Sequence, residues 1–339
     1  MRLSVLDQSP VIAGSSPAQA IDETLKLARA VEALGYARYW LAEHHAIAAL
    51  GDPCPEVLLG RLGAETSRIR VGTGGVLLPY YSAFKVAEIF RMLEALYPGR
   101  VDLGIGRAPG GDARTARAVG GGRFPDAEHF PQQVWELVGH LDGTLPEDHP
   151  ERGVRLQPGG ATVPEVWLLG SSDYSGLLAA QLGLRFAFAH FINPQGGDLV
   201  MRAYKERFRP AQKRDAGPHT LLCCSVICCE TDAEAERQAK VIDLRRLEMA
   251  YNLDTPVPTL EQALARDFSQ IEQEHIRAQR ARLVFGSPQT CKARLLELAE
   301  QYAADELMVL TITGDYRRRR ASYELLADAF SLSRSAPAA

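Results

Sequence analysis

Residues 38–45 read RYWLAEHH, a short apolar strand that runs directly into a glutamate and two histidines. The pattern recurs, because polar residues or glycines also follow other apolar stretches, at Asp7-Gln8-Ser9, Gly74-Gly75, Arg107, Ser171-Ser172, His190 and Thr313. In a closed (β/α)8 barrel the carboxyl ends of all the strands form one ring, where active sites lie. An open, doubly wound sheet would scatter these residues along an edge. The sequence therefore predicts a single (β/α)8 (TIM) barrel.

Eight predicted strands alternate with helices along the chain. The strands are expected at 3–6, 38–42, 69–75, 101–106, 165–169, 185–189, 220–228 and 306–311. Capping signals mark helix starts, such as Ser16-Pro17 and Thr231-Asp232. We expect one domain over residues 1–331, a flexible tail over 332–339, and less regular insertions near 107–126, 143–163 and 250–282. Residues 258–281 are predicted to be an extra helical segment that, with the loop 107–125, shapes the substrate pocket.

The composition is that of an ordinary globular protein. The 339 residues are 46% hydrophobic and 24% charged, and the net charge is −4. This balance gives no reason to expect binding to nucleic acid or to acidic membranes. The first residues lack the features of a signal peptide, and no apolar run is long enough to span a bilayer. We therefore expect a cytoplasmic location.

Six cysteines need an interpretation, because four of them cluster in CCSVICC at 223–229. The segment has strand character, so the side chains of adjacent cysteines point to opposite faces. The C-x2-C spacing of zinc sites is missing. We interpret these cysteines as buried structural thiols and expect no metal site.

Two stretches carry the chemistry that the residues themselves suggest. In Glu43-His44-His45, we expect at least one histidine to act in catalysis or binding, since imidazole is a suitable base at neutral pH. The alternative is packing of one histidine and a loop position for the other.

The second stretch is GSSDYS at 170–175, where serine hydroxyls and backbone N–H groups at a helix start make a natural phosphate cradle. Arg107 ends the fourth strand and is suited to grip the same phosphate. Plain capping of the helix by Ser172 or Asp173 is the competing interpretation. Asp173 would repel a phosphate, so we expect its side chain to point outward.

Longer segments resemble the bacterial luciferase-like flavin-dependent oxidoreductases, and most closely their short single-subunit members. The resemblance rests on AEHH at 42–45, VGTGGVLLP at 71–79, YPGRVDLGIGRAPG at 97–110, VWLLGSSDYS at 166–175 and AAQLGLRFAFA at 179–189. It covers nearly the whole chain, in the order of the barrel strands.

The resemblance implies a barrel that binds reduced FMN, often delivered by a separate NAD(P)H-flavin reductase. His44 corresponds to the family's base near the flavin, and Arg107, Ser172 and Ser175 to its phosphate ligands. The remaining cofactor contacts are assigned to Glu43, Gly74, Gly75, Gly106, Gly170 and Ser171. Luciferase itself has a cysteine at Gly106 and an acidic residue at Ser171, so light emission and aldehyde use are not implied. The Gly74–Gly75 peptide is expected to be cis.

We therefore interpret the chain as an FMN-dependent monooxygenase that uses O2 on a small organic substrate. The alternatives are an F420-dependent oxidoreductase that transfers hydride and a flavin-binding protein without turnover. The resemblance also implies a homodimer formed through the second and third helices. We expect Gly60, Gly63 and Ala64 on one of these helices and Val86, Phe90 and Leu93 on the other to form its contacts.

Overall fold

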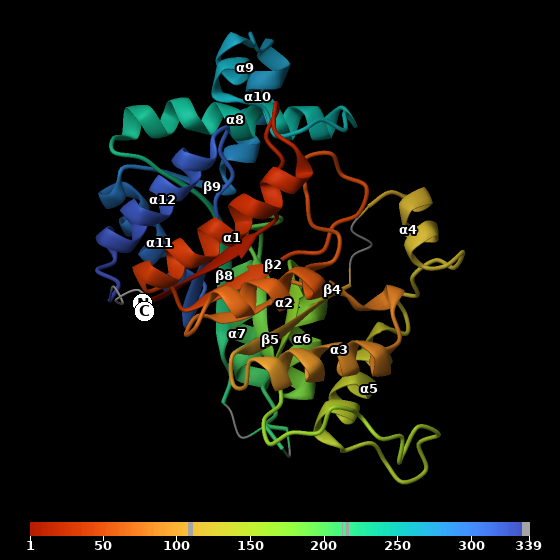
Figure 1. Cartoon of the computed structure of the whole chain (residues 1–339). Helices are drawn as coiled ribbons and strands as arrows, with labels where there is room; N and C mark the ends of the chain where they lie inside the picture. The colour runs from red at the N-terminus through yellow and green to blue at the C-terminus, as the bar shows by residue number, and fades with distance from the viewer. Residues whose placement is uncertain (108–110, 212, 215–216, 334–339) are drawn as a thin grey trace.

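A computed structural model describes residues 1–107, 111–211, 213–214 and 217–333. Eight parallel strands form a closed barrel, because β8 pairs with β10 to complete the order β10-β1-β2-β3-β5-β6-β7-β8 (Figure 1). The barrel strands are β1 (Arg2–Asp7), β2 (Arg38–Leu41), β3 (Arg70–Thr73), β5 (Val101–Gly106), β6 (Glu165–Gly170), β7 (Arg185–Ala189), β8 (Thr220–Cys228) and β10 (Glu306–Leu310). The predicted (β/α)8 barrel and all eight of its strands are confirmed.

Helices cover the outside of the barrel (Figure 1). They are α1 (Pro17–Leu34), α2 (Pro55–Glu65), α3 (Ala83–Leu96), α5 (Phe130–Asp142), α6 (Asp173–Leu182), α7 (Gly197–Arg207), α8 (Asp232–Ala250), α11 (Pro288–Gln301) and α12 (Tyr316–Ala329). The capping signals act as predicted, since the hydroxyls of Ser16 and Thr231 accept hydrogen bonds from the backbone of the first turns of α1 and α8.

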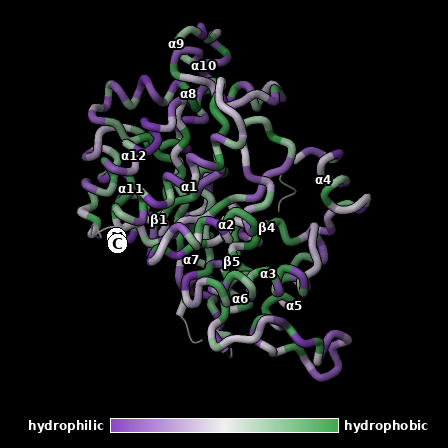
Figure 2. Tube along the Cα trace, viewed as in Figure 1, coloured by the Kyte–Doolittle hydropathy of each residue, from purple (hydrophilic) through white to green (hydrophobic). Residues whose placement is uncertain are grey.

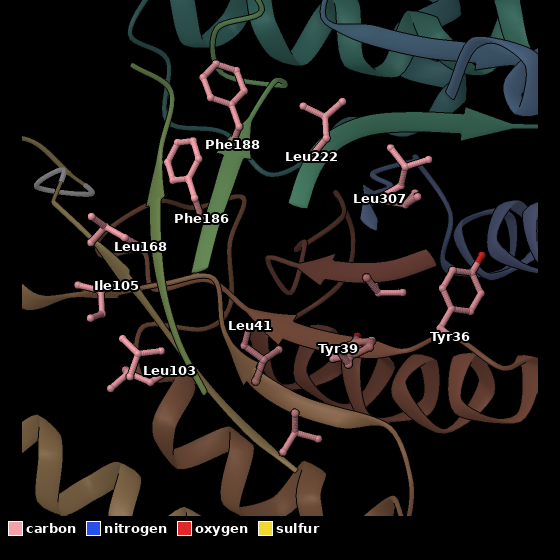
Figure 3. Close-up of a cluster of buried hydrophobic side chains, with 14 of the residues drawn as sticks. Tyr36, Tyr39, Leu41, Leu103, Ile105, Leu168, Phe186, Phe188, Leu222 and Leu307 are labelled. Atoms are coloured by element: carbon pink, nitrogen blue, oxygen red, sulfur yellow. The ribbon is translucent and has the colours of Figure 1, made fainter. Parts of the chain in front are cut away.

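Apolar side chains form a large core between strands and helices and a smaller one inside the barrel. Figure 3 shows part of the outer core, and in Figure 2 the hydrophilic colours lie largely on peripheral segments. Alternation along β8 divides the cysteines between these cores, with Cys223 inside the barrel and Cys224 in the outer cluster. All four clustered cysteines are buried, as predicted. Among the described residues, no group of His, Cys, Asp or Glu is arranged to hold a metal ion.

Several short elements were not predicted. The strand expected at 69–75 ends at Thr73, and a two-residue strand β4 (Val76–Leu77) and a 3-10 helix η1 (Leu78–Tyr80) follow. The insertion after β5 contains α4 (Ala113–Val119), and the segment 258–281 forms α9 (Leu260–Ala265) and α10 (Gln270–Arg280) instead of one helix. The strand β9 (Leu283–Gly286) pairs with the far end of β8 from Ser225 onward, and Ser225 is also the last residue of β8 that pairs with β10.

The helix face expected to form a dimer interface is partly wrong. Val86, Phe90 and Leu93 are at most 5% exposed because they pack in the core. A Cβ atom on Gly63 would lie 2.4 Å from the Tyr97 ring, so Gly63 serves packing within the chain, whereas Gly60 has open space. No helix in the described part of the chain is long and apolar enough to cross a membrane.

Candidate active site

A cavity of about 250 Å³ opens at the carboxyl ends of the barrel strands. All ten residues that the sequence predicted for the site line it: Glu43, His44, Gly74, Gly75, Gly106, Arg107, Gly170, Ser171, Ser172 and Ser175. They come from the ends of β2, β3, β5 and β6, which the closed barrel brings to one face.

One wall of the cavity is suited to an anion. The Arg107 guanidinium lies 4.4 Å above the centre of the Tyr174 ring, and no carboxylate in the described ranges forms an ion pair with it. Ser172 stands at the N-cap of α6 without a hydroxyl hydrogen bond to the helix. The Ser172 hydroxyl therefore does not cap α6. Asp173 is exposed and does not line the cavity, so it points outward as predicted.

Gly170 allows the close packing of this wall. A Cβ atom at Gly170 would lie 2.4 Å from Cβ of Ser175, closer than real Cβ contacts. Ser175 is 4% exposed and lines the cavity from the first turn of α6. The strand end thus carries a glycine so that the helix start can approach it.

The adjacent wall of the cavity is formed by the backbone of Gly74 and Gly75, which have no side chains. The Gly74–Gly75 peptide bond is cis, as the sequence predicted. A Cβ atom on Gly75 would lie 2.6 Å from the Gly104 carbonyl oxygen, and one on Gly74 would lie 2.7 Å from Leu6. Two glycines are needed here because neighbouring strands approach too closely for larger residues.

His44 lines the cavity at the end of β2. Its Nδ1 is buried and has no hydrogen-bond partner among the residues that the structure describes. Burial lowers the pKa of His44, a hydrogen bond with the Ala42 backbone partly opposes this, and neighbouring His45 lowers it slightly further. The imidazole is therefore favoured in its neutral form, in which a ring nitrogen can accept a proton.

Glu43 and His45, the sequence neighbours of His44, form a hydrogen bond with each other. Glu43 accepts hydrogen bonds from the Leu77 N–H and the Tyr81 hydroxyl, and it also pairs with His45. His45 does not line the cavity. Of the two adjacent histidines, the structure brings His44 to the cavity and turns His45 to the carboxylate.

The apolar floor of the cavity was missed by sequence reasoning. It is formed by side chains inside the barrel, among them Leu6, Trp40, Leu221, Cys223 and Met308. The barrel strands are apolar on both faces, so hydrophobicity does not reveal which residues point inward. Alternation along β8 was the available signal for Leu221 and Cys223.

Some expectations about the pocket are corrected by the structure. His190 and Thr313 follow strands but do not line the cavity, because His190 is buried against Tyr302 and the Thr313 hydroxyl donates to the Asp315 carbonyl. No residue of the segment 258–281 lines the cavity either. Instead, α9 and α10 pack against α8 at the periphery (Figure 1).

The model of the family described as luciferase-like monooxygenase matches residues 1–305. The chain belongs to this family. Protein YceB of Bacillus subtilis is 43% identical, with 97% of this chain and 99% of YceB covered. The N-acetyl-S-alkylcysteine monooxygenase of B. subtilis is 33% identical, over 97% of this chain and 98% of that protein.

Solved structures agree with the family assignment. The crystal structure of apo-MsnO8 is 38% identical and has a TM-score of 0.89, over 98% of this chain and 99% of MsnO8. Two more distant structures share the fold alone. They are the oxygenating constituent of 3,6-diketocamphane monooxygenase from Pseudomonas putida with FMN (19% identity, TM-score 0.68, 97% of each chain) and an F420-dependent secondary alcohol dehydrogenase (13%, 0.71, 97% of this chain and 98% of that one).

Proposed function

We propose that the protein is an FMN-dependent monooxygenase that uses reduced FMN and O2 to oxygenate a small organic substrate. The observation that carries the proposal is Arg107, without an ion-pair partner in the described part of the chain, beside the serine-lined start of α6 at one wall of a cavity that also contains His44. An unpaired cation, free hydroxyls and helix N–H groups suit a phosphate. The membership in a monooxygenase family supports the reaction class.

The chemistry of the residues that line the cavity supports FMN as the cofactor. Arg107, Ser172 and Ser175 would hold the phosphate, with Gly170 and Ser171 contributing backbone at the same end. The backbone at Gly74–Gly75 and the side-chain-free Gly106 leave room for a flat ring.

Bound reduced FMN would supply the electrons for oxygen insertion, and the protein would control the surroundings. The apolar floor with Leu6, Trp40 and Met308 keeps water away from the reacting groups. His44 would accept or hold a proton at its unpartnered Nδ1. The substrate would be a small organic compound.

The second candidate is an F420-dependent oxidoreductase that transfers hydride, which the shared fold of the F420-dependent alcohol dehydrogenase supports. A flavin-binding protein without turnover is the third. We further propose a cytoplasmic homodimer that receives reduced FMN from a separate NAD(P)H-flavin reductase.

Flavin binding to an Arg107→Ala variant tests the phosphate assignment. We expect FMN affinity to fall by about 10- to 150-fold, because a charge-assisted contact contributes about 1.5–3 kcal/mol. Riboflavin, which has no phosphate, should bind both proteins equally. Arg114→Ala on the neighbouring α4 is the matched control and should change neither. Equal losses for FMN and riboflavin would contradict the assignment.

A reductase-coupled assay separates the three candidate functions. Candidate substrates, such as ketones, thioethers and aromatics, are supplied with FMN, NADH and a flavin reductase, and product and O2 uptake are measured together. One O2 consumed for each oxygenated product supports a monooxygenase. Turnover with F420 and no O2 uptake would favour the dehydrogenase, and tight flavin binding without product would favour the third candidate.

A further inference from the structure

A buried network of side chains stands directly behind His44. The Glu43 side chain is 1% exposed and accepts three hydrogen bonds, from the Leu77 N–H at 2.8 Å, the Tyr81 hydroxyl at 2.6 Å and the His45 ring Nε2 at 2.7 Å. A carboxylate taken out of water requires such partners, because its desolvation costs several kcal/mol. In the described part of the chain, His45 is the one basic side chain within ion-pair distance of Glu43.

The donors of this network follow two different strand ends, both of which contribute residues to the cavity. His45 follows His44 at the end of β2, whereas Leu77 and Tyr81 belong to the segment after Gly74–Gly75. The Glu43 carboxylate therefore ties the wall with His44 to the wall of bare backbone. Burial and the Glu43 carboxylate raise the pKa of Tyr81, so its hydroxyl remains a donor.

We propose that Glu43, His45 and Tyr81 form a positioning network for His44, and that the Glu43 carboxylate is not itself a cofactor ligand. The network sets the position of His44 against the backbone wall and holds the His45 ring against the Glu43 carboxylate. The inference rests on the proposed function, because it assigns the network to the proton acceptor of that reaction.

Charged and titratable groups near His44 influence its pKa. Burial is the main cause of the lowered pKa of His44, a hydrogen bond with the Ala42 backbone opposes it, and the charge of His45 is a smaller lowering cause. The other titratable or charged side chains on the surrounding elements are Glu43, Asp52, Glu56, Tyr80, Tyr81 and Arg107. A positive charge at His45 opposes protonation of His44 and so keeps it able to accept a proton.

The test follows the titration of the His44 ring by NMR in protein with isotope-labelled histidine, with the signal assigned through His44→Asn. His45→Gln keeps a hydrogen-bond donor for Glu43 but removes the charge. We expect the His44 midpoint to rise by about 0.5–1 pH unit. Glu43→Gln removes the carboxylate itself, whose charge also acts on His44, and is therefore used in the binding test instead of the titration. His129→Gln breaks a similar pair, with Asp126 at 2.6 Å on the surface, and should leave the midpoint unchanged.

FMN binding to the same variants tests the second half of the inference. We expect Glu43→Gln to bind FMN within about twofold of wild type. A more than tenfold loss in Glu43→Gln that His45→Gln does not share would show that the carboxylate is a cofactor ligand and overturn the inference. An unmoved His44 midpoint in His45→Gln would also overturn it.

A folding check and FMN binding by the wild-type protein distinguish failure of the network from failure of the proposed function. If Glu43→Gln fails to fold by circular dichroism, His45→Gln decides alone, since it retains the donor to the carboxylate. If the wild-type protein binds no FMN, the proposed function fails, whereas the His44 titration still judges the network.

Discussion

Asp52 is a carboxylic acid whose surroundings disfavour its charged form. One oxygen accepts a hydrogen bond from the Cys54 N–H, and the other is buried without a partner in the described residues. Burial raises the pKa of Asp52 to about 7, and the carboxylates of Asp7 and Glu56 add to this effect. The folded state therefore binds a proton at Asp52 that the unfolded chain has already released.

This difference predicts how stability depends on pH. Because the folded pKa of Asp52 lies above its unfolded value of 3.8, its contribution is complete below pH 3.8 and is lost as pH rises through 7. Asp52→Asn should therefore raise the free energy of unfolding at pH 8 by a few kcal/mol, on the order of what several pKa units represent, and change it little at pH 4. Urea melts at both pH values measure this, with the exposed Asp22→Asn as control. An equal effect at both pH values would contradict the pKa assignment.

Buried ion pairs join the starts of several barrel strands. Arg38 begins β2 and contacts Asp102 at 2.7 Å, Glu306 at 3.0 Å and Glu165 at 3.1 Å, which lie at the starts of β5, β10 and β6. These charges satisfy one another at the end of the barrel opposite the cavity. Polar residues at the starts of the strands therefore contribute to stability, and those after the strand ends are available for binding.

We expect Arg38→Met to destabilise the protein by about 3–5 kcal/mol, because it leaves buried carboxylates unpaired. Arg29→Met is the matched control, since Arg29 forms an exposed pair with Glu65 at 2.7 Å that should contribute less than about 1 kcal/mol. Denaturant melts measure both. Similar small losses in the two variants would show that the strand-start network is not a source of stability.

Exposed apolar residues on α2 and α3 are candidate contacts between two copies of the molecule. Val57 on α2 is 72% exposed, and Met92 and Leu96 on α3 are 53% and 57% exposed. The two helices contact each other (Figure 1). We propose that these side chains, with the open Gly60, form the homodimer interface in place of the buried Val86, Phe90 and Leu93.

The dimer prediction is tested by sedimentation at micromolar concentration. The wild-type protein should sediment as a dimer, and Met92→Asp should shift it to monomer, because a charge buried at an interface without a partner is costly. Leu253→Asp changes an apolar residue, 50% exposed, in the insertion after α8 and should leave the dimer intact. A monomeric wild-type protein, or a dimer that both variants retain, would refute this interface.

The sequence by itself determined the barrel and the residues around its cavity. Strands such as RYWL at 38–41 are followed at once by functional residues, and a parallel barrel places every such strand end on one face. All ten predicted site residues therefore meet, although they are spread over more than 130 positions of the chain. Local capping signals similarly marked the starts of α1 and α8.

Only the tertiary structure decided what each neighbouring side chain does. Glu43, His44 and His45 are adjacent in sequence, but their partners, such as Tyr81 and Leu77, come from another strand end. Hydrophobicity gave no signal for which residues, such as Trp40 or Met308, form the cavity floor, because both faces of each strand are buried. The short strand β9 depends on pairing with an extension of β8 some 55 residues earlier in the chain. Contacts between distant segments set these features, and local patterns do not encode them.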